Sequence, residues 1–224
     1  SSLEPVVPKL RIPVKAITLT LALAILLLIA AHSLVVLHYK VGFDLPVELI
    51  DRFHLDREAN LPTWFSSSLY LLLALAFALL AALERRLPGG GRPHPAYLTG
   101  LALLFAFISL DETARLHELF DTLTKVKWVY VAAPFVLLLA GLYGRYFILL
   151  RKDAPQFRRG VLLGLGLAVL GGVVVELIPH YFALPYALGQ IEYVLEEGLE
   201  MTGALIMLAA ALGQVNRNLE RLGA

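Results

Sequence analysis

Cysteine is absent from this chain of 224 residues. Its absence excludes disulfide bonds, thiolate-bound zinc or iron–sulfur centres, and a cysteine nucleophile. Any metal ion would therefore depend on His, Asp and Glu ligands, which favour hard or borderline ions. Charge is also scarce, since charged residues make up 17% of the chain against about 25% in soluble domains. No basic face of the kind that nucleic acid requires is present, so nucleic acid is excluded as a partner.

Most of the sequence consists of long apolar stretches. The chain is 58% hydrophobic with a mean hydropathy of +0.74, which predicts an all-α, polytopic membrane helix bundle in one domain over residues 1–224. Each stretch has roughly the 20 residues that cross a bilayer core. The six predicted transmembrane helices cover about 13–38, 63–83, 95–119, 127–150, 159–180 and 189–212. The sequence Asn60-Leu61-Pro62 is a start signal for the second, with Pro near the first helical position. Basic residues precede the first, as in a signal peptide, but its length favours an uncleaved span.

Residues 44–59 differ from the spans. Pro46, Leu49, Ile50 and Phe53 recur at helical spacing with charged residues between them. This pattern predicts a short amphipathic helix in the membrane interface, and the alternative is a polar loop.

The direction of insertion follows from Lys and Arg, which concentrate in cytoplasmic segments. If the N-terminus is inside, 13 of the 19 basic residues lie on the cytoplasmic side and 14 of the 18 acids lie in the outer half or outside. We therefore predict a multi-pass protein of a plasma (inner) membrane with both termini cytoplasmic.

Several acids and histidines lie inside or against the predicted spans. They are Asp111, Glu112, His117, Glu176, His180, Glu196, Glu197 and Glu200. An ionised side chain at mid-bilayer costs roughly 2.5–3.5 kcal/mol on insertion scales, so such residues are rare and usually functional. With a rise of about 1.5 Å per residue, Glu112 and Glu196 both lie roughly 10 Å below the outer surface. The third, fifth and sixth spans thus bring acids to one outward layer.

The spacing of these residues sets their faces. Glu176 and His180 are i,i+4 neighbours, and Glu192, Glu196 and Glu200 form a ladder with the same step. Stacked carboxylates persist only if some are protonated or if cations lie among them.

Other polar residues have simpler interpretations. Asp111, Arg115 and Glu118 are expected to neutralise one another as an ion ladder, and His32 and His38 to lie at the interface. Gly160, Gly164, Ala168, Gly171 and Gly172 form a face of small residues that allows another helix to approach closely.

The leading hypothesis is an outward-facing metal site of a membrane-embedded metalloenzyme. Helical bundles build such centres from Glu and His on several helices. The predicted ligands of a divalent zinc, iron or manganese ion are Glu112, Glu176, His180, Glu196 and Glu200. Glu197 and His117 are the candidate catalytic bases, or partners that orient the ligands. The enzyme would be a hydrolase or oxidoreductase, and its substrate a membrane lipid, a quinone or another membrane-dissolved molecule.

Two other classes stay open. Intramembrane Glu and His also serve cation or proton transporters and channels, although the inner halves of the spans are almost wholly apolar. A non-catalytic subunit, scaffold or haem carrier could use His32, His117 or His180, and a homo-oligomer is possible. The layout also resembles that of the alkaline-ceramidase-like membrane hydrolases. Their pattern of three zinc histidines is absent here, where Glu176 and His180 form the corresponding pair, so no residue is carried over from them.

Overall fold

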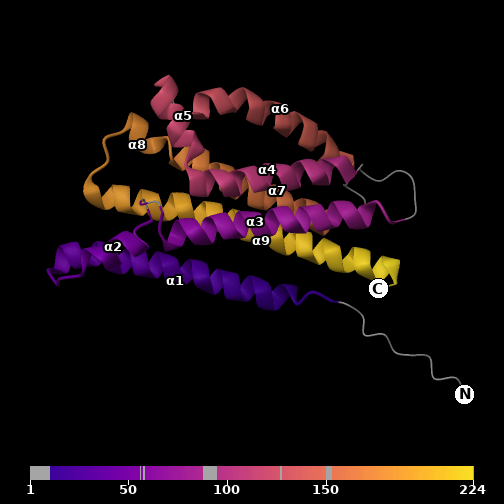
Figure 1. The fold of residues 1–224 in the computed structure, drawn as a ribbon, viewed down its shortest axis with the longest axis horizontal. Helices are drawn as coiled ribbons and strands as arrows, with labels where there is room; N and C mark the ends of the chain where they lie inside the picture. Colours follow the sequence, from indigo (N-terminus) through magenta and orange to yellow (C-terminus); the bar gives the residue numbers. More distant parts are fainter. Residues whose placement is uncertain are drawn as a thin grey trace, which may run out of the picture.

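Long apolar segments fold into helices because a helix satisfies its own backbone hydrogen bonds, which lipid cannot do. The computed structural model describes residues 11–55, 57, 59–87, 95–126, 128–149 and 153–223, and within these ranges every regular element is a helix. Most of them run along one long axis (Figure 1). They are α1 (Val14–Val41), α2 (Val47–Phe53), α3 (Leu61–Glu84), α4 (Pro95–Ala114), α5 (Leu116–Thr124), α6 (Trp128–Leu149), α7 (Pro155–Val169), the π-helical turn η1 (Leu170–Val175), α8 (Ile178–Tyr181) and α9 (Tyr186–Leu222).

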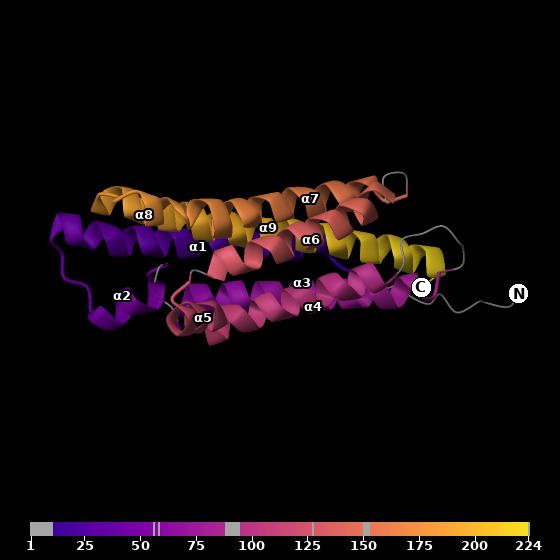
Figure 2. The ribbon, with the colours of Figure 1, turned by 90° about the horizontal axis from the view of Figure 1, so that it is seen from above.

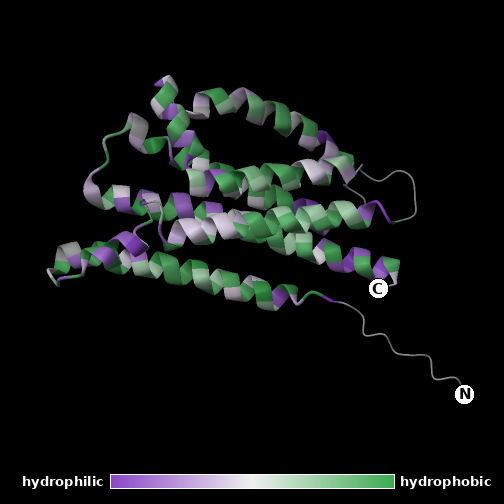
Figure 3. Cartoon of the chain, viewed as in Figure 1, coloured by the Kyte–Doolittle hydropathy of each residue, from purple (hydrophilic) through white to green (hydrophobic). Residues whose placement is uncertain are grey.

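Five helical segments are long and apolar enough to cross a membrane. They are Val14–His38, Leu61–Glu84, Pro95–Ala114, Pro155–Val175 and Tyr186–Leu222. Apolar residues dominate the middle of these helices (Figure 3). The protein is thus an all-helical membrane protein, as its sequence predicts. The fourth predicted span coincides with α6, and its crossing of the bilayer stays a prediction.

Both ends of the described chain lie at the same end of the bundle. The Asn216 side chain near the end of α9 accepts a hydrogen bond from the Ile12 N–H and donates one to the Ile12 carbonyl, each at 2.9 Å. The short helices α2, α5 and α8 lie at the opposite end (Figure 1). The predicted number of six crossings, and the side of the membrane that each end faces, stay predictions.

The core lies where α3 meets α4 and α9. Figure 2 shows α3 beside α4, and α7 beside α9, as two adjacent layers. The side chains of Leu73, Phe77 and Leu80 on α3 are fully buried. The Phe77 ring stacks on Phe105 at 5.6 Å and meets Phe157 edge-on at 6.1 Å, measured between ring centroids. Since lipid is as apolar as this core, its cohesion comes from close packing rather than from exclusion of water.

Asn60 separates the short helix α2 from the span α3. Its Oδ1 accepts the Thr63 N–H at 3.1 Å, which caps α3, and its Nδ2 donates to the carbonyls of His54 and Arg57 at 2.6 Å each. The start of α3 was predicted here from the sequence Asn60-Leu61-Pro62 and is confirmed. The predicted interfacial helix at 44–59 forms only over Val47–Phe53, with Ile50 buried. Its position in the membrane interface stays a prediction.

The predicted face of small residues packs α7 against α9, which is confirmed. A Cβ atom on Gly164 would lie 2.4 Å from the Gly203 carbonyl oxygen, and a Cβ atom on Gly203 would lie 2.4 Å from the Gly164 carbonyl oxygen. The two backbones therefore touch, and only glycine fits at either position.

Gly203→Ala is expected to destabilise the bundle by about 1–3 kcal/mol, because the added methyl group forces the two backbones apart. Thermal unfolding of the purified protein in detergent measures this change. The matched control is Gly166→Ala, also on α7, where a Cβ atom meets nothing within 4 Å. Equal unfolding temperatures for the two variants would contradict the described crossing.

Candidate functional site

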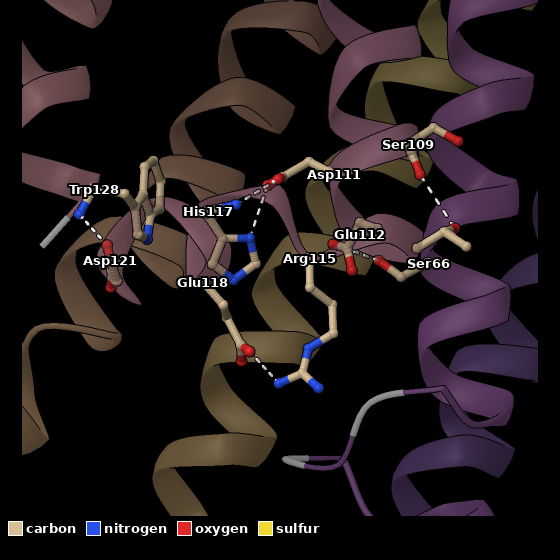
Figure 4. A network of polar contacts seen from close by, with 10 residues as sticks. Ser66, Ser109, Asp111, Glu112, Arg115, His117, Glu118, Asp121 and Trp128 are labelled. Atoms are coloured by element: carbon tan, nitrogen blue, oxygen red, sulfur yellow. Dashed lines mark hydrogen bonds and ion pairs between the residues drawn. The ribbon is translucent and has the colours of Figure 1, made fainter. Parts of the chain in front are cut away.

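A break between α4 and α5 shapes one wall of the site. Arg115 adopts a left-handed backbone conformation with φ 54°, so α4 ends at Ala114 where the predicted third span continued to residue 119. This conformation is strained for a residue other than glycine, and such strain is often stored at functional sites. Asp111 holds the break in place. Its Oδ1 accepts the His117 backbone N–H, and its Oδ2 bonds His117 Nδ1, each at 2.9 Å (Figure 4).

The bond to Asp111 orients the His117 ring and leaves Nε2 as the ring nitrogen that does not bond Asp111. A histidine that is tied to a carboxylate in this way is typical of metal ligands and of general bases. Arg115 pairs with Glu118, so that part of the predicted ion ladder is confirmed. The bond of Asp111 to His117 was not predicted, because it depends on the break at residue 115.

The surroundings of His117 favour its charged form. The hydrogen bond to Asp111 raises the pKa of His117 above its usual 6.5, and the negative charges of Asp111, Glu176 and Glu118 add to this effect. Together they outweigh burial, which acts in the opposite direction. The Trp128 ring lies 5.9 Å from the His117 ring.

Glu112 directly follows Asp111 on α4 and bonds a hydroxyl group of α3. Ser66 of α3, which is buried, donates to Glu112 Oε1 at 3.3 Å (Figure 4). Beside this bond, the Ser67 hydroxyl donates to the Ser109 carbonyl and the Ser109 hydroxyl donates to the Ser67 carbonyl, each at 2.8 Å. These bonds fasten α3 to α4 at the level of the acids.

The π-helical turn η1 makes room for Glu200. In this turn the Glu176 N–H bonds the Gly171 carbonyl, five residues back, at 3.3 Å. A Cβ atom on Gly172 would lie only 2.6 Å from Glu200 Oε1, so the carboxylate rests directly on this glycine. The Tyr70 side chain of α3 lies close enough to interact with the same carboxylate. Such π-helical turns occur frequently at functional sites.

The sequence analysis did not predict this π-helical turn. Gly171 and Gly172 were interpreted as packing residues, and Gly171 does pack on α9, where its Cβ would lie 2.6 Å from the Glu196 carbonyl oxygen. A glycine pair one turn before Glu176 was the available signal that the helix opens there.

The structure brings most of the predicted site residues within electrostatic range of one another. Glu200 interacts with Glu112, Glu176, Glu196 and Glu197. Glu196 interacts electrostatically with Glu192, and His117 interacts with Glu176. Among the described side chains, however, no three of His, Asp and Glu are arranged to hold a metal ion. The His180 side chain lies outside the described residues, so its predicted role as a ligand stays a prediction.

His32 has a different environment from the interface position that we expected. It is buried, with 1% of its surface exposed, and its Nδ1 accepts the Leu55 N–H at 3.1 Å. The His54 ring meets it edge-on at 4.9 Å, between centroids. Because Nδ1 accepts a hydrogen bond, the neutral ring carries its proton on Nε2. Neither nitrogen then offers a free lone pair to a metal or to haem iron.

Below the acids, the bundle is closed by apolar side chains. The buried residues of α9 between Glu200 and Gln214 are Met201, Gly203, Ala204, Leu205, Met207, Leu208 and Ala211. At about 1.5 Å per residue, this layer is roughly 20 Å thick. The acids thus lie near the end of the bundle that carries α2, α5 and α8.

This fold defines a polytopic helical membrane protein. The chain belongs to the family described as a domain of unknown function (DUF8692), which it matches over residues 20–215. The match includes every predicted site residue. Neither the curated proteins nor the solved structures contain a match to the chain.

Asp111→Asn is expected to lower the pKa of His117, because it removes both the hydrogen-bonded carboxylate and its charge. The raised pKa means that protonated His117 stabilises the fold at low pH, and that this contribution is lost as pH rises through the raised pKa. An NMR titration of histidine-labelled protein, assigned with His117→Gln, measures the change.

Glu118→Gln is the graded control, since Glu118 contributes least to the shift. It should lower the pKa of His117 by less than Asp111→Asn does. An unchanged His117 titration in Asp111→Asn would show that the two side chains are not bonded.

Proposed function

We propose that this protein is a membrane-embedded metalloenzyme whose divalent cation binds among Glu112, Glu176, Glu196 and Glu200. His180 is the expected fifth ligand, from its i,i+4 spacing to Glu176. The supporting observation is that Glu200 interacts with four other carboxylates, which come from α4, α9 and the residue after η1.

A cation is favoured because the known partners of the central acids are neutral. Tyr70 lies beside Glu200 and Ser66 donates to Glu112, and both neighbours offer neutral hydroxyl groups. Hydroxyls satisfy carboxylate oxygens but do not cancel their charge. Several carboxylates in one partly buried layer repel one another unless protons or a cation lie among them. No three of the described His, Asp and Glu side chains are arranged to hold a metal ion. Binding would therefore require Glu112 or Glu176 to turn towards Glu200.

The chemistry would combine the cation with His117. A divalent cation can polarise a substrate carbonyl and activate water or an oxidant. His117 Nε2, oriented by Asp111, is the candidate general base, and Glu197 is the alternative. The thick apolar layer below Glu200 favours a closed reaction site over a conducting path. We therefore propose hydrolysis or oxidation of a lipid-like substrate, with the site facing outwards from a plasma membrane.

Metal analysis tests the proposal. The purified protein, dialysed against Zn²⁺ or Mn²⁺, should retain one ion per chain, and Glu200→Gln should weaken binding at least tenfold by removing one ligand charge. Gly172→Ala should also weaken it, because the new methyl group displaces the Glu200 carboxylate without removing any acid.

The control is Glu48→Gln, which removes an exposed acid of α2 and should leave binding unchanged. A wild-type protein that retains no Zn²⁺, Mn²⁺ or Fe²⁺ would refute the metal site. Equal metal binding by Glu200→Gln and Glu48→Gln would show that the ion binds at another site.

One observation favours proton coupling as the second candidate. Glu192 is buried one turn before Glu196 on α9, and two such neighbouring carboxyl groups repel each other unless at least one carries a proton or a cation lies between them. A proton-coupled transporter would show flux in proteoliposomes that Glu196→Gln abolishes. Our account predicts no flux for wild type or variant, and measurable flux that depends on Glu196 would favour the transporter.

A further inference from the structure

The helix α5 has one apolar face and one polar face. Leu116, Leu119, Phe120 and Leu123 follow the i, i+3, i+4, i+7 spacing that places side chains on one side of a helix. The remaining residues of this helix are His117, Glu118, Asp121, Thr122 and Thr124, all polar. This helix of nine residues therefore needs an apolar environment on one side and a polar environment on the other.

The described parts of the chain leave much of the apolar face uncovered. Leu119 is 54% exposed and Leu123 is 73% exposed, and no residue of α5 is buried. Figure 1 places α5 at one end of the bundle, with α2 and α8 at the same end. By contrast, α2 buries its own Ile50. The apolar face of α5 therefore needs a partner other than the described residues.

Two features identify that partner as the lipid bilayer. First, α5 begins only two residues after α4, a candidate membrane span that ends at Ala114, so it stands at the boundary where that span leaves the bilayer. Second, Arg115 and Lys125 flank the helix at its two ends, where their positive charges complement lipid phosphates. An apolar face flanked by cations is the signature of a helix that lies in the membrane interface.

We propose that α5 lies in the plane of the bilayer interface, with Leu119, Phe120 and Leu123 among the upper acyl chains. Arg115 and Lys125 then lie at the level of the phosphates. This proposal does not depend on metal binding or on catalysis.

The interfacial position has a consequence for the site. His117 lies in the first turn of α5 and is fastened to Asp111. Insertion of α5 would thus hold the His117 ring at the depth of the lipid headgroups. If the proposed enzyme exists, its scissile or oxidised group lies near the headgroup rather than at the end of an acyl chain. This consequence alone rests on the proposed function.

Spin labels can measure the depth of α5 directly. Since the chain has no cysteine, Leu123→Cys and Thr122→Cys each give a single labelling site in the full protein. The probe is the protein in nanodiscs of phosphatidylcholine and phosphatidylglycerol, with oxygen as the membrane-soluble relaxing agent and a nickel chelate as the aqueous one.

The label at Leu123 should be at least threefold more accessible to oxygen than to the nickel chelate, relative to the label at the adjacent Thr122. Equal and high exposure of both labels to nickel would overturn the proposal, because α5 would then lie in water. Protection of Leu123 from both agents would also overturn it and would indicate a protein partner or a second copy.

A charge on the apolar face provides a second test. Leu123→Asp should raise the nickel accessibility of a label at Leu119→Cys, because α5 would leave the acyl layer, whereas Thr122→Asp should not. Circular dichroism checks that both variants stay folded. No difference between the two aspartates would contradict an inserted apolar face.

Discussion

Repulsion among acids inside a membrane is the constraint on which this structure depends. Glu200 interacts with four other carboxylates, and the hydroxyl groups beside it and Glu112, from Tyr70 and Ser66, are neutral. Ionised groups at this depth are expensive, and hydroxyl groups do not remove their charge. The arrangement is stable only if positive charge, from protons or a cation, is also present. That requirement connects the helix bundle to its proposed function.

The local backbone is built around the same acids. The π-helical turn at η1 brings Gly172 against the Glu200 carboxylate, where any larger residue would displace it. The left-handed Arg115 ends α4 and allows Asp111 to bind both the backbone and the ring of His117. Both irregularities lie at the level of the acids, whereas the apolar layer below them is regular helix packed through Phe77 and its neighbours. Both irregularities thus lie in the region where chemistry is proposed.

Much of this arrangement was predictable from the sequence, because it depends on local patterns. Apolar length located the long helices, Asn60 marked the start of α3, and the spacing of Glu192, Glu196 and Glu200 placed them on one face. The bond between Asp111 and His117 was not predictable, since six residues separate them and a continuous helix would hold them apart. The burial of His32 depends likewise on the loop that brings the Leu55 N–H to it. These contacts arise from backbone irregularities, which propensity and periodicity do not indicate.

Anomalous diffraction from crystals of the full chain grown with Mn²⁺ tests the central claim most directly. We predict one peak within about 2.0–2.3 Å of a Glu200 carboxylate oxygen, a distance typical of oxygen ligands to such ions, with a second ligand from Glu112, Glu176 or Glu196. A map without that peak, in which each of these carboxylates is paired with its own lysine or arginine, would contradict the account.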